Sequence, residues 1–568
     1  MFDKNGFLLQ FIRLSAPFWQ SENKTKIRQL TFALFGLTVI QIAIAVLITE
    51  WSANLFNALE QRSMSDVLLQ VGMIILIFVA NIGVTVTHFK IKRLLQLDWR
   101  NWLTTKLIAQ WMNDGRHYLV THIQAKSEDA HDNPDGRIAE DVRIATESAI
   151  DLAHSLTFCL LILISFTKIL WTLSGVITLD LGFIEIPIYG HLVLLATLYA
   201  AGASVLGWWI GRPLTKATNV RQTVEANFRF GLVNARENSL AISLVHGEHT
   251  EQQRCYHLFN DIIDAWQRQT TAWSHILMFT SGHSILLMAF PILVSSPRFV
   301  LGSISLGALM QSAQAFQQMA SALSWPVDNM AKIADWRASV ERILSLTHAL
   351  DALEEEISHI DPNRIERIKT DKPVLRLHDL CVVRLDGMIC VNKMNVEIKA
   401  GERILIAGNA FTGSKLFKAI VGFWPWGGGK IELPNDEVVF IPPRPYLPSG
   451  TLRTAICYPL AEQDVNQKEL EEKLDLVGLS GLRKYLDDPR IGGWDADLSR
   501  EQQQRLGAVR LLLQQPKWIL LEQAFDSLDS NDEIAMLRLI CQELPKSAIL
   551  TITHESRAEA FHQRIITL

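Results

Sequence analysis

The sequence lacks paired cysteines. No C-x-x-C pair occurs, and no cysteine has a histidine nearby at metal-ligand spacing. A disulfide framework and a zinc site are therefore excluded, and we predict no metal site. We expect buried thiols at the six cysteines, which are Cys159, Cys255, Cys381, Cys390, Cys457 and Cys541.

Basic residues are not in excess either. The chain has 54 Lys and Arg against 59 Asp and Glu, a formal net charge of -5 at pH 7, and no basic stripe interleaved with aromatic residues. Nucleic acid is therefore excluded as a partner. The N-terminus also lacks a secretory signal, because Arg13 interrupts its apolar stretch and no small-residue cleavage site follows. We expect residues 1–28 to form an interfacial helix on the membrane.

Apolar residues, by contrast, are abundant. They make up 49% of the 568 residues, so the chain is too long for one domain and too apolar for an ordinary soluble enzyme. A membrane-spanning helix takes about 20 mainly apolar residues. We therefore predict a transmembrane domain over residues 29–345 with six helices. The predicted spans are residues 30–49, 67–88, 152–174, 191–210, 273–295 and 300–323.

The distribution of Lys and Arg orients these spans. Residues 89–151 and 211–272 are rich in both, whereas the connectors 50–66 and 175–189 are short and poor in them. By the positive-inside rule, both termini lie in the cytoplasm and the chain crosses the lipid bilayer several times. The two basic segments are helical by pattern, so we expect the spanning helices to continue far past the membrane.

Hydropathy falls towards the C-terminal half. Residues 346–372 form a predicted linker that is charged and has no sustained apolar face. Residues 373–568 then open with alternating strands and pass to apolar runs separated by helical patterns. This layout predicts an α/β nucleotide-binding domain after the α-helical membrane domain.

Five short motifs follow one another in the α/β half. They are "GNAFTGSK" at 408–415, "LSREQQQRL" at 498–506, "WILLEQ" at 518–523, "DSLD" at 526–529 and "TITH" ending at His554. In this order they resemble the Walker A, signature, Walker B, D-loop and switch-histidine motifs of an ABC transporter ATPase domain. Further similarity to the subfamily D half-transporters and their YddA-type relatives lies in residues 132–142, 323–343, 421–434 and 446–459. The membrane half also resembles the SbmA/BacA peptide uptake proteins.

This resemblance covers nearly the whole chain. It implies a helical domain like that of type IV ABC exporters, followed by a P-loop ABC nucleotide-binding domain. Subfamily D is known for fatty-acyl transport, so a bulky amphipathic, acyl or peptidic solute is implied. The implied cofactor is ATP with Mg²⁺, and the implied location is the bacterial inner membrane. A homodimer is implied as well, because each family site joins the Walker A of one subunit to the signature of the other.

Walker A departs from the family pattern. Ser414 stands at the position of the lysine that reaches the phosphates, and Lys415 stands at the position of the hydroxyl that ligates magnesium. One position along a helix rotates a side chain by about 100°, so Lys415 is no simple substitute. Phe411 replaces a glycine. Gly408 and Gly413 remain, and backbone N–H groups at a helix N-terminus can hold an anion without the lysine.

The other motifs depart in the same direction. Pro443 replaces the Q-loop glutamine, and Glu501 replaces a glycine of the signature that contains Ser499. Walker B has Glu522 for the usual Asp, followed by Gln523 where the family has the glutamate that activates water. An amide cannot accept that proton, and loss of a general base costs about 10² to 10⁴ in rate. We therefore predict impaired or absent ATP hydrolysis.

Each motif also has a purely structural interpretation. Asp529 of the D-loop and His554 match the family pattern, but His554 can equally be a satisfied histidine at a strand end. The glycines of the first motif can serve turns alone. Ser499 can cap a helix that residues 503–505 solvate.

The membrane half has candidates of its own. His283 lies about midway along the fifth predicted span, where it can titrate near neutral pH or simply hydrogen-bond to a neighbouring helix. By resemblance, Glu225, Arg229 and Glu248 lie near the coupling region and the cavity floor. Their alternative place is a solvated cytoplasmic helix.

Four functional hypotheses remain open. The first is an ABC-type half-transporter with impaired hydrolysis, and the second a proton-driven transporter whose nucleotide domain is only a scaffold. The third is a non-transporting membrane scaffold or nucleotide sensor. The fourth keeps ATP-driven transport, with Lys415 drawn into place by the dimer partner.

Overall fold

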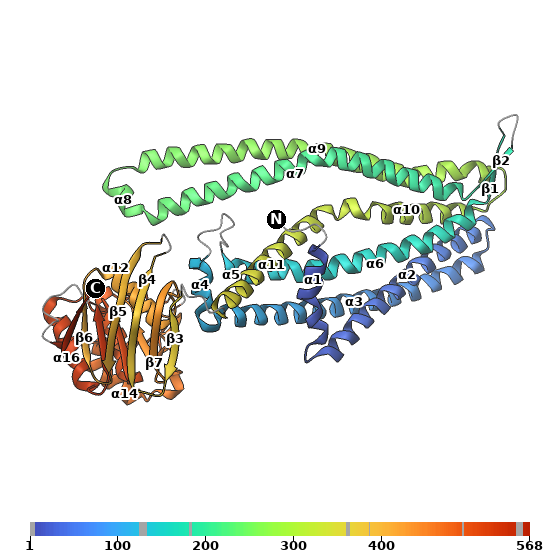
Figure 1. The fold of residues 1–568 in the computed structure, drawn as a ribbon. Helices are drawn as coiled ribbons and strands as arrows, with labels where there is room; N and C mark the ends of the chain where they lie inside the picture. The colour runs from blue at the N-terminus through green and yellow to red at the C-terminus, as the bar shows by residue number, and fades with distance from the viewer. Residues whose placement is uncertain are drawn as a thin grey trace. The chain divides into compact units, whose positions relative to one another are not determined.

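The computed structural model describes residues 6–123, 133–180, 185–358, 364–384, 387–490, 493–552 and 561–568. The chain divides into two compact units (Figure 1). One unit is helical and consists of Met1–Met112 and Ser127–Leu350. The other consists of Asn113–Lys126 and Asp351–Leu568 and contains two larger β-sheets. The predicted order, a helical membrane half followed by an α/β half, is confirmed.

Long helices make up the first unit. They are α2 (Lys24–Glu60), α3 (Met64–Met112), α6 (Val142–Ser174), α7 (His191–Glu237), α9 (Glu248–Val300), α10 (Leu306–Asp328) and α11 (Met330–Ser358). Shorter elements are α1 (Phe7–Ser15), η1 (Ala16–Gln20), α5 (Pro134–Gly136), η4 (Arg137–Asp141), α8 (Ser239–Leu244) and the hairpin β1 (Val176–Asp180) and β2 (Glu185–Tyr189). Helices α7 and α9 run side by side and are joined through α8 (Figure 1).

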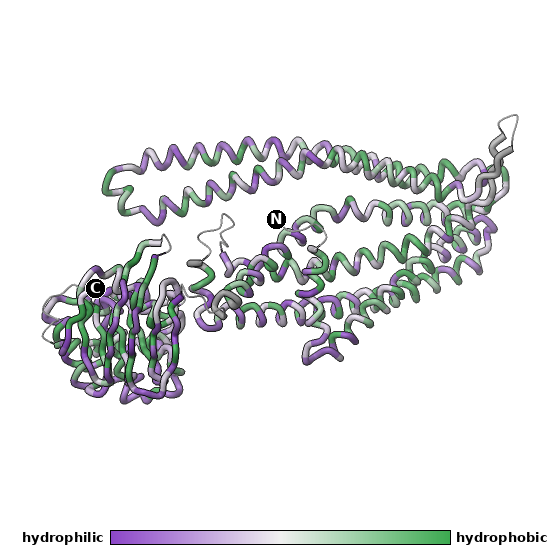
Figure 2. The backbone as a smooth tube through the Cα atoms, in the orientation of Figure 1, coloured by the Kyte–Doolittle hydropathy of each residue, from purple (hydrophilic) through white to green (hydrophobic). Residues whose placement is uncertain are grey.

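Five helices of the described chain are long and apolar enough to cross a membrane. Their ranges are Lys24–Glu60, Met64–Val120, Pro134–Ser174, His191–Glu237 and Glu248–Val300. Each contains one of the first five predicted spans and extends beyond it, as expected. Figure 2 shows the reason: along α7 and α9, hydrophilic residues gather towards α8 and apolar residues towards the opposite end.

The sixth predicted span is placed differently. We predicted it over residues 300–323, but α9 continues to Val300 and α10 begins only at Leu306. Gly302 has a φ of +70° between the two helices, and the Ser305 side chain caps α10 by accepting from the Ala308 N–H. The 23-residue α10 packs against α2, α6, α7 and α9. Whether it spans a bilayer stays a prediction.

The core of the helical unit lies where α10 meets α6 and α7. Phe166 of α6 and Phe316 of α10 are buried there with Ala196 and Ala315, whose small side chains let helices approach closely. Gly307 of α10 lies very close to α2, because a Cβ at this position would overlap the Ala53 carbonyl. No other residue type fits there without moving a helix.

The second unit is built on two sheets. A parallel five-stranded sheet has the order β13-β6-β12-β11-β8, and a mixed four-stranded sheet has the order β3-β7-β4-β5. The strands of the first are β6 (Arg403–Ala407), β8 (Val438–Ile441), β11 (Trp518–Glu522), β12 (Ala548–Ile552) and β13 (Arg564–Thr567). The strands of the second are β3 (Glu366–Thr370), β4 (Val374–Val383), β5 (Ile389–Lys399) and β7 (Gly427–Pro434).

Helices connect and flank these sheets. They are α12 (Ala410–Val421), α13 (Leu452–Cys457), α14 (Gln467–Leu476), α15 (Arg500–Gln514) and α16 (Ser530–Glu543), with the short pair β9 (Gly450–Thr451) and β10 (Pro489–Arg490). The 3-10 turns are η2 (Asn113–Gly115), η5 (Glu462–Asp464) and η6 (Ser480–Tyr485). Helix α4 (Arg116–Ile123) also belongs to this unit, where the Tyr118 and Phe423 ring centroids lie 5.5 Å apart.

The predicted linker is largely structured. Helix α11 continues through residues 346–358, and β3 occupies 366–370 of the range that we predicted as linker. Leu346, Leu350 and Leu353 are buried, so the helix does have an apolar face. The prediction of a linker without such a face was wrong over this stretch, because the acidic run 354–356 masked the helical spacing of the leucines before it.

Candidate functional site

Most of the first motif, residues 408–415, lies in a helix. Helix α12 begins at Ala410, and Asn409 caps it by accepting a hydrogen bond from the Phe411 N–H at 2.9 Å. The Gly413 N–H donates to the Asn409 carbonyl at 3.1 Å. Gly413, Ser414 and Lys415 therefore lie within the first turns of the helix. Two of the amides that a phosphate loop would present are already bonded inside the chain.

Both glycines of this motif meet structural demands. Gly408 has a φ of +138°, which other residues rarely adopt. A Cβ on Gly413 would lie 2.6 Å from Cδ1 of Ile552 on β12, so only glycine lets α12 pack this closely on the sheet. Gly408 therefore fits the interpretation of a turn glycine, whereas Gly413 lies within helix α12 and serves close packing.

Lys415 faces aromatic rings. Its Nζ lies 3.6 Å from the ring centroid of Trp424 and 5.3 Å from that of Phe411. Trp424 is buried and donates its Nε1–H to the Val383 carbonyl at 2.9 Å. Burial, together with the nearby charge of Lys418, lowers the pKa of Lys415. A cation–π contact thus holds the ammonium group of Lys415. Ser414, at the position of the family lysine, is the residue before it in the helix.

The Walker B motif ends a central strand. Glu522 is buried at the end of β11, and Gln523 follows with a φ of +46° and donates its N–H to the Ile552 carbonyl at 2.8 Å. Gln504, to which the sequence analysis gave only a solvating role, joins this region to the signature helix α15. Its Nε2 donates to the Pro443 carbonyl at 3.0 Å and to Asp526 Oδ1 at 2.6 Å. The buried side-chain amide of Gln504, in the signature helix, therefore contacts Pro443 at the Q-loop position and Asp526 of the D-loop.

The signature residues serve α15 itself. Ser499 and Gln502 form a capping box, in which each side chain accepts from the backbone N–H of the other. This confirms the capping interpretation of Ser499. The expectation that residues 503–505 solvate the helix was wrong, because Gln503 and Gln504 are buried and each forms hydrogen bonds with neighbouring loops.

Asp529 and His554 complete the list for this unit. Asp529 caps α16 by accepting from the N–H groups of Asn531 at 3.0 Å and Asp532 at 2.8 Å. His554 lies outside the described residues. Ser499 and Asp529, which both match the family motifs, thus both act as helix caps.

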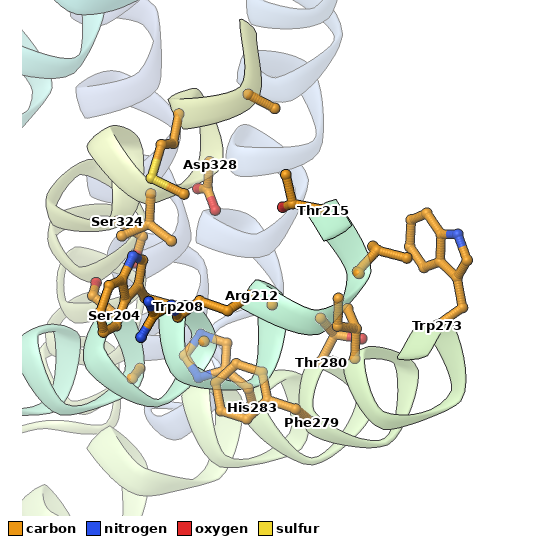
Figure 3. Close-up of a pocket in the computed structure, with 18 of the residues that line it drawn as sticks. Ser204, Trp208, Arg212, Thr215, Trp273, Phe279, Thr280, His283, Ser324 and Asp328 are labelled. Carbon is orange, nitrogen blue, oxygen red and sulfur yellow. The ribbon is translucent and has the colours of Figure 1, made fainter. Parts of the chain in front are cut away.

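A second site lies in the helical unit. A cavity of about 970 Å³ is lined by residues of α7, α9, α10 and α11 (Figure 3). Trp208, Arg212, Trp273 and Asp328 are among the side chains around it, so it combines aromatic walls with both signs of charge. The Arg212 guanidinium lies 4.8 Å from the Trp208 ring centroid.

His283 lines this cavity and is tied to a neighbouring helix. The Tyr199 hydroxyl lies 3.0 Å from His283 Nδ1 and donates to the His283 carbonyl at 3.2 Å. The ring stacks on Phe279, with the centroids 5.8 Å apart. The interhelical hydrogen bond that we weighed as the alternative for His283 is present, and the residue also has access to the cavity.

The three other membrane-half candidates lie elsewhere. Glu225 and Arg229 are exposed on α7, and Glu248 is exposed at the first residue of α9. Glu225 accepts a hydrogen bond from Arg221 Nε at 2.8 Å. None of the three lines the cavity that contains His283. The structure therefore separates them from His283, and their surroundings match the alternative of a solvated helix.

Comparisons with known proteins agree with this architecture. The ABC transporter transmembrane region 2 family matches residues 17–300. The chain is 28% identical over 558 residues to the inner membrane ABC transporter ATP-binding protein YddA of Escherichia coli strain K12, covering 96% of this chain and 95% of YddA. It is 25% identical over 629 residues to the chloroplastic ABC transporter D family member 2 of Arabidopsis thaliana, covering 98% and 86%.

A solved structure has the same fold. The chain resembles a bacterial Atm1-family ABC exporter with ATP bound, with a TM-score of 0.71 and 15% sequence identity. The match covers 95% of this chain and 93% of the exporter. The predicted exporter-like fold, with a helical domain followed by an α/β domain, is confirmed.

Proposed function

This chain belongs to the ABC transporter transmembrane region 2 family, and from this premise we propose that two copies form an inner-membrane transporter with impaired or absent ATP hydrolysis. The arrangement of one helical unit and one α/β unit is that of a half-transporter, which needs a second copy to complete each family ATP site. The similarity to an inner membrane protein of Escherichia coli supports the location.

The cavity of the helical unit supports a bulky amphipathic, acyl or peptidic solute. Its volume of about 970 Å³ is large enough for such a molecule. Trp208, Trp273 and Phe279 offer apolar contact, while Arg212 and Asp328 offer charge. A solute with one polar end and an apolar body would satisfy both parts of this wall.

The placement of Lys415 carries the proposal of impaired hydrolysis. ATP with Mg²⁺ is the cofactor implied by the similar ABC proteins, and Gly408, Gly413, Ser414 and Glu522 are the residues that would meet it. They fit it poorly. The only lysine of the motif points its amine at Trp424, and the amides of Phe411 and Gly413 are bonded to Asn409. We therefore derive no catalytic step through the nucleotide.

Nucleotide turnover tests this part of the proposal. The purified protein in lipid nanodiscs is given Mg-ATP, with Gln523→Ala and His554→Ala as controls for contaminating ATPases. We expect the same background rate in all three. A wild-type rate that falls in either variant would show that the protein hydrolyses ATP.

Transport is tested separately in proteoliposomes. The probes are a fluorescent acyl chain and a fluorescent peptide, and Arg212→Gln removes a charge from the cavity wall. We expect Arg212→Gln to slow transport and Arg229→Gln, which is exposed on the same helix outside the cavity, to leave it unchanged. Equal rates in both variants would mean that the cavity does not bind the solute.

The position of His283 supports a second candidate function. It borders the cavity and shares a hydrogen bond with Tyr199, so a proton gradient can act on a titratable group next to the solute. In this variant the nucleotide domain serves as a dimer scaffold. We expect transport that is stimulated by acid and abolished by an uncoupler. Transport that does not depend on the proton gradient would rule out this second function.

A further inference from the structure

A histidine pair lies where α3 packs against α6. The ring centroids of His88 and His154 are 4.3 Å apart. The Nε2 atom of each is buried and has no hydrogen-bond partner among the residues that the structure describes. His88 is only 6% exposed. A buried ring nitrogen without a hydrogen-bond partner is unfavourable, so two of them side by side point to a ligand that bonds both.

The pair borders a cavity of about 460 Å³ between α2, α3 and α6. Lys92 lies on the same wall one helical turn after His88, and Ile44 and Ile48 of α2 form an apolar part of the lining. This cavity is separate from the one that contains His283, since the two share no lining residue. Its wall combines one ammonium group, two imidazoles and an apolar face.

The charges around the pair do not balance. Asp151 accepts from two lysines at once, with Lys92 Nζ at 3.1 Å and Lys332 Nζ at 2.9 Å. Gln96 also donates to Asp151, at 3.0 Å. One carboxylate therefore faces two ammonium groups, and Lys92 can turn to a ligand while Lys332 keeps Asp151 paired.

One helical turn earlier on α6, a second carboxylate again faces two basic side chains. Glu147 lies 3.8 Å from Arg93 and 4.0 Å from Arg100. Four basic side chains on α3 and α11 thus share two carboxylates on α6, which leaves two positive charges in excess even with both imidazoles neutral. The residues that α2 contributes to the cavity carry no charge. Such surroundings oppose a metal cation and favour an anion.

The basic and the apolar parts of the cavity lie at different depths in the predicted membrane. His88 ends the second predicted span at its cytoplasmic side, and His154 lies near the cytoplasmic start of the third. Ile44 and Ile48 lie further along α2, towards the connector 50–66 on the opposite side. The basic groups are therefore at headgroup depth and the apolar wall is deeper. Basic pockets between membrane helices at the cytoplasmic side commonly bind lipid headgroups.

We propose that this cavity binds the phosphate group of an anionic phospholipid from the cytoplasmic leaflet. His88, Lys92 and His154 contact the phosphate oxygens, and an acyl chain lies along Ile44 and Ile48. The amides of Gln41 and Asn81 line the same cavity at a greater depth than His88. A lipid held here would tie together the three helices that carry it, independently of solute or nucleotide.

Lipid titration of the full-length protein in detergent tests the proposal. The apparent unfolding temperature is followed as phosphatidylglycerol, phosphatidylcholine or inorganic phosphate is added, and retained lipid is counted by native mass spectrometry. We expect stabilisation by phosphatidylglycerol alone. Its affinity should fall about tenfold in Lys92→Gln and in His154→Gln, the loss expected for one charge-assisted bond. His154→Gln leaves every ion pair intact, so it remains informative if Lys92→Gln fails to fold.

Lys90→Gln is the matched control. Lys90 is exposed on α3 two residues after His88, which places it on the other side of the helix. General attraction between basic helices and acidic lipid would lose as much affinity in Lys90→Gln as in Lys92→Gln, and that result would overturn the site. Equal stabilisation by phosphatidylcholine or by inorganic phosphate would overturn the choice of ligand. Neither readout depends on transport or on ATP.

Discussion

The ammonium group of Lys415 lies 3.6 Å from the centre of the Trp424 ring, on a helix whose first turn begins five residues earlier, at Ala410. In an ABC ATPase of the usual pattern, the corresponding helix presents a lysine to the phosphates of ATP. Here the side chain of Ser414 stands at that position, and the neighbouring lysine contacts an aromatic ring that is itself buried. In this structure Lys415 therefore makes a packing contact with an aromatic ring.

This contact predicts a stabilising role for Lys415. We expect Lys415→Met to lower the apparent unfolding temperature by roughly 2–4 °C, because a partly desolvated cation–π pair contributes about 1 kcal/mol. Nucleotide binding should not change. Lys418→Met is the control, since Lys418 Nζ lies 5.9 Å from the Tyr118 ring centroid, at the outer limit of a cation–π contact. Loss of ATP binding at unchanged stability would show that Lys415 serves the nucleotide instead.

A second prediction concerns the missing general base. We expect Gln523→Glu alone to leave Mg-ATP turnover at background, because the amides and the lysine that would hold the phosphates are engaged elsewhere. The measurement is phosphate release in nanodiscs, with Gln523→Ala in parallel. A rise of about 10² to 10⁴, the range that a general base supplies, would mean that the phosphate site works and only the base was absent.

Gln504 should be a structural centre of the second unit. Its side chain is 2% exposed, donates to Pro443 and Asp526, and accepts from the Ser527 N–H at 2.9 Å. We expect Gln504→Ala to destabilise this unit by about 2–4 kcal/mol, since it removes several buried hydrogen bonds and leaves their partners unpaired. Chemical unfolding followed by tryptophan fluorescence measures the loss. Gln467→Ala on the exposed face of α14 should be neutral, and similar losses in both variants would contradict the prediction.

Gly413 offers a test of close packing. A methyl group there would meet Cδ1 of Ile552 at 2.6 Å, so Gly413→Ala should cost about 1–3 kcal/mol. Shortening the neighbour in the double variant Gly413→Ala, Ile552→Val should recover part of the loss. Gly481→Ala is the control, because nothing lies within 4 Å of its added carbon. Full stability of Gly413→Ala would mean that the glycine is kept for a ligand and not for the sheet.

The sequence predicted the large features because each has a local cause. Long apolar runs bounded by basic segments specify α2, α3, α6, α7 and α9, and alternating strands followed by buried runs specify the two sheets. The motif order also supplied the candidate site residues of the α/β unit, whose roles stay predictions. These signals act over single helices and strands, so they survive without knowledge of the tertiary structure.

The start of α12, the burial of Gln504 and the histidine pair were not predicted. The first was overlooked because of the family pattern, and the other two depend on tertiary packing. Asn409 is a favourable N-cap residue, and it could have predicted the early start of α12 if the segment had not been read as a phosphate loop. The burial of Gln504 has no local signal, since three successive glutamines look solvated until α15 packs into the core. His88 and His154 are 66 positions apart in the chain, and only the packing of α3 against α6 brings them together.

The cap that Asn409 provides affects how the stability of the α/β unit depends on ATP. A phosphate-binding loop whose N–H groups are unpaired without nucleotide is stabilised when ATP binds. The free energy of unfolding of such a domain therefore rises with the ATP concentration. This helix instead completes its first turn with a side chain of its own. We therefore expect the thermal stability of the α/β unit to stay the same when the ATP concentration rises or falls.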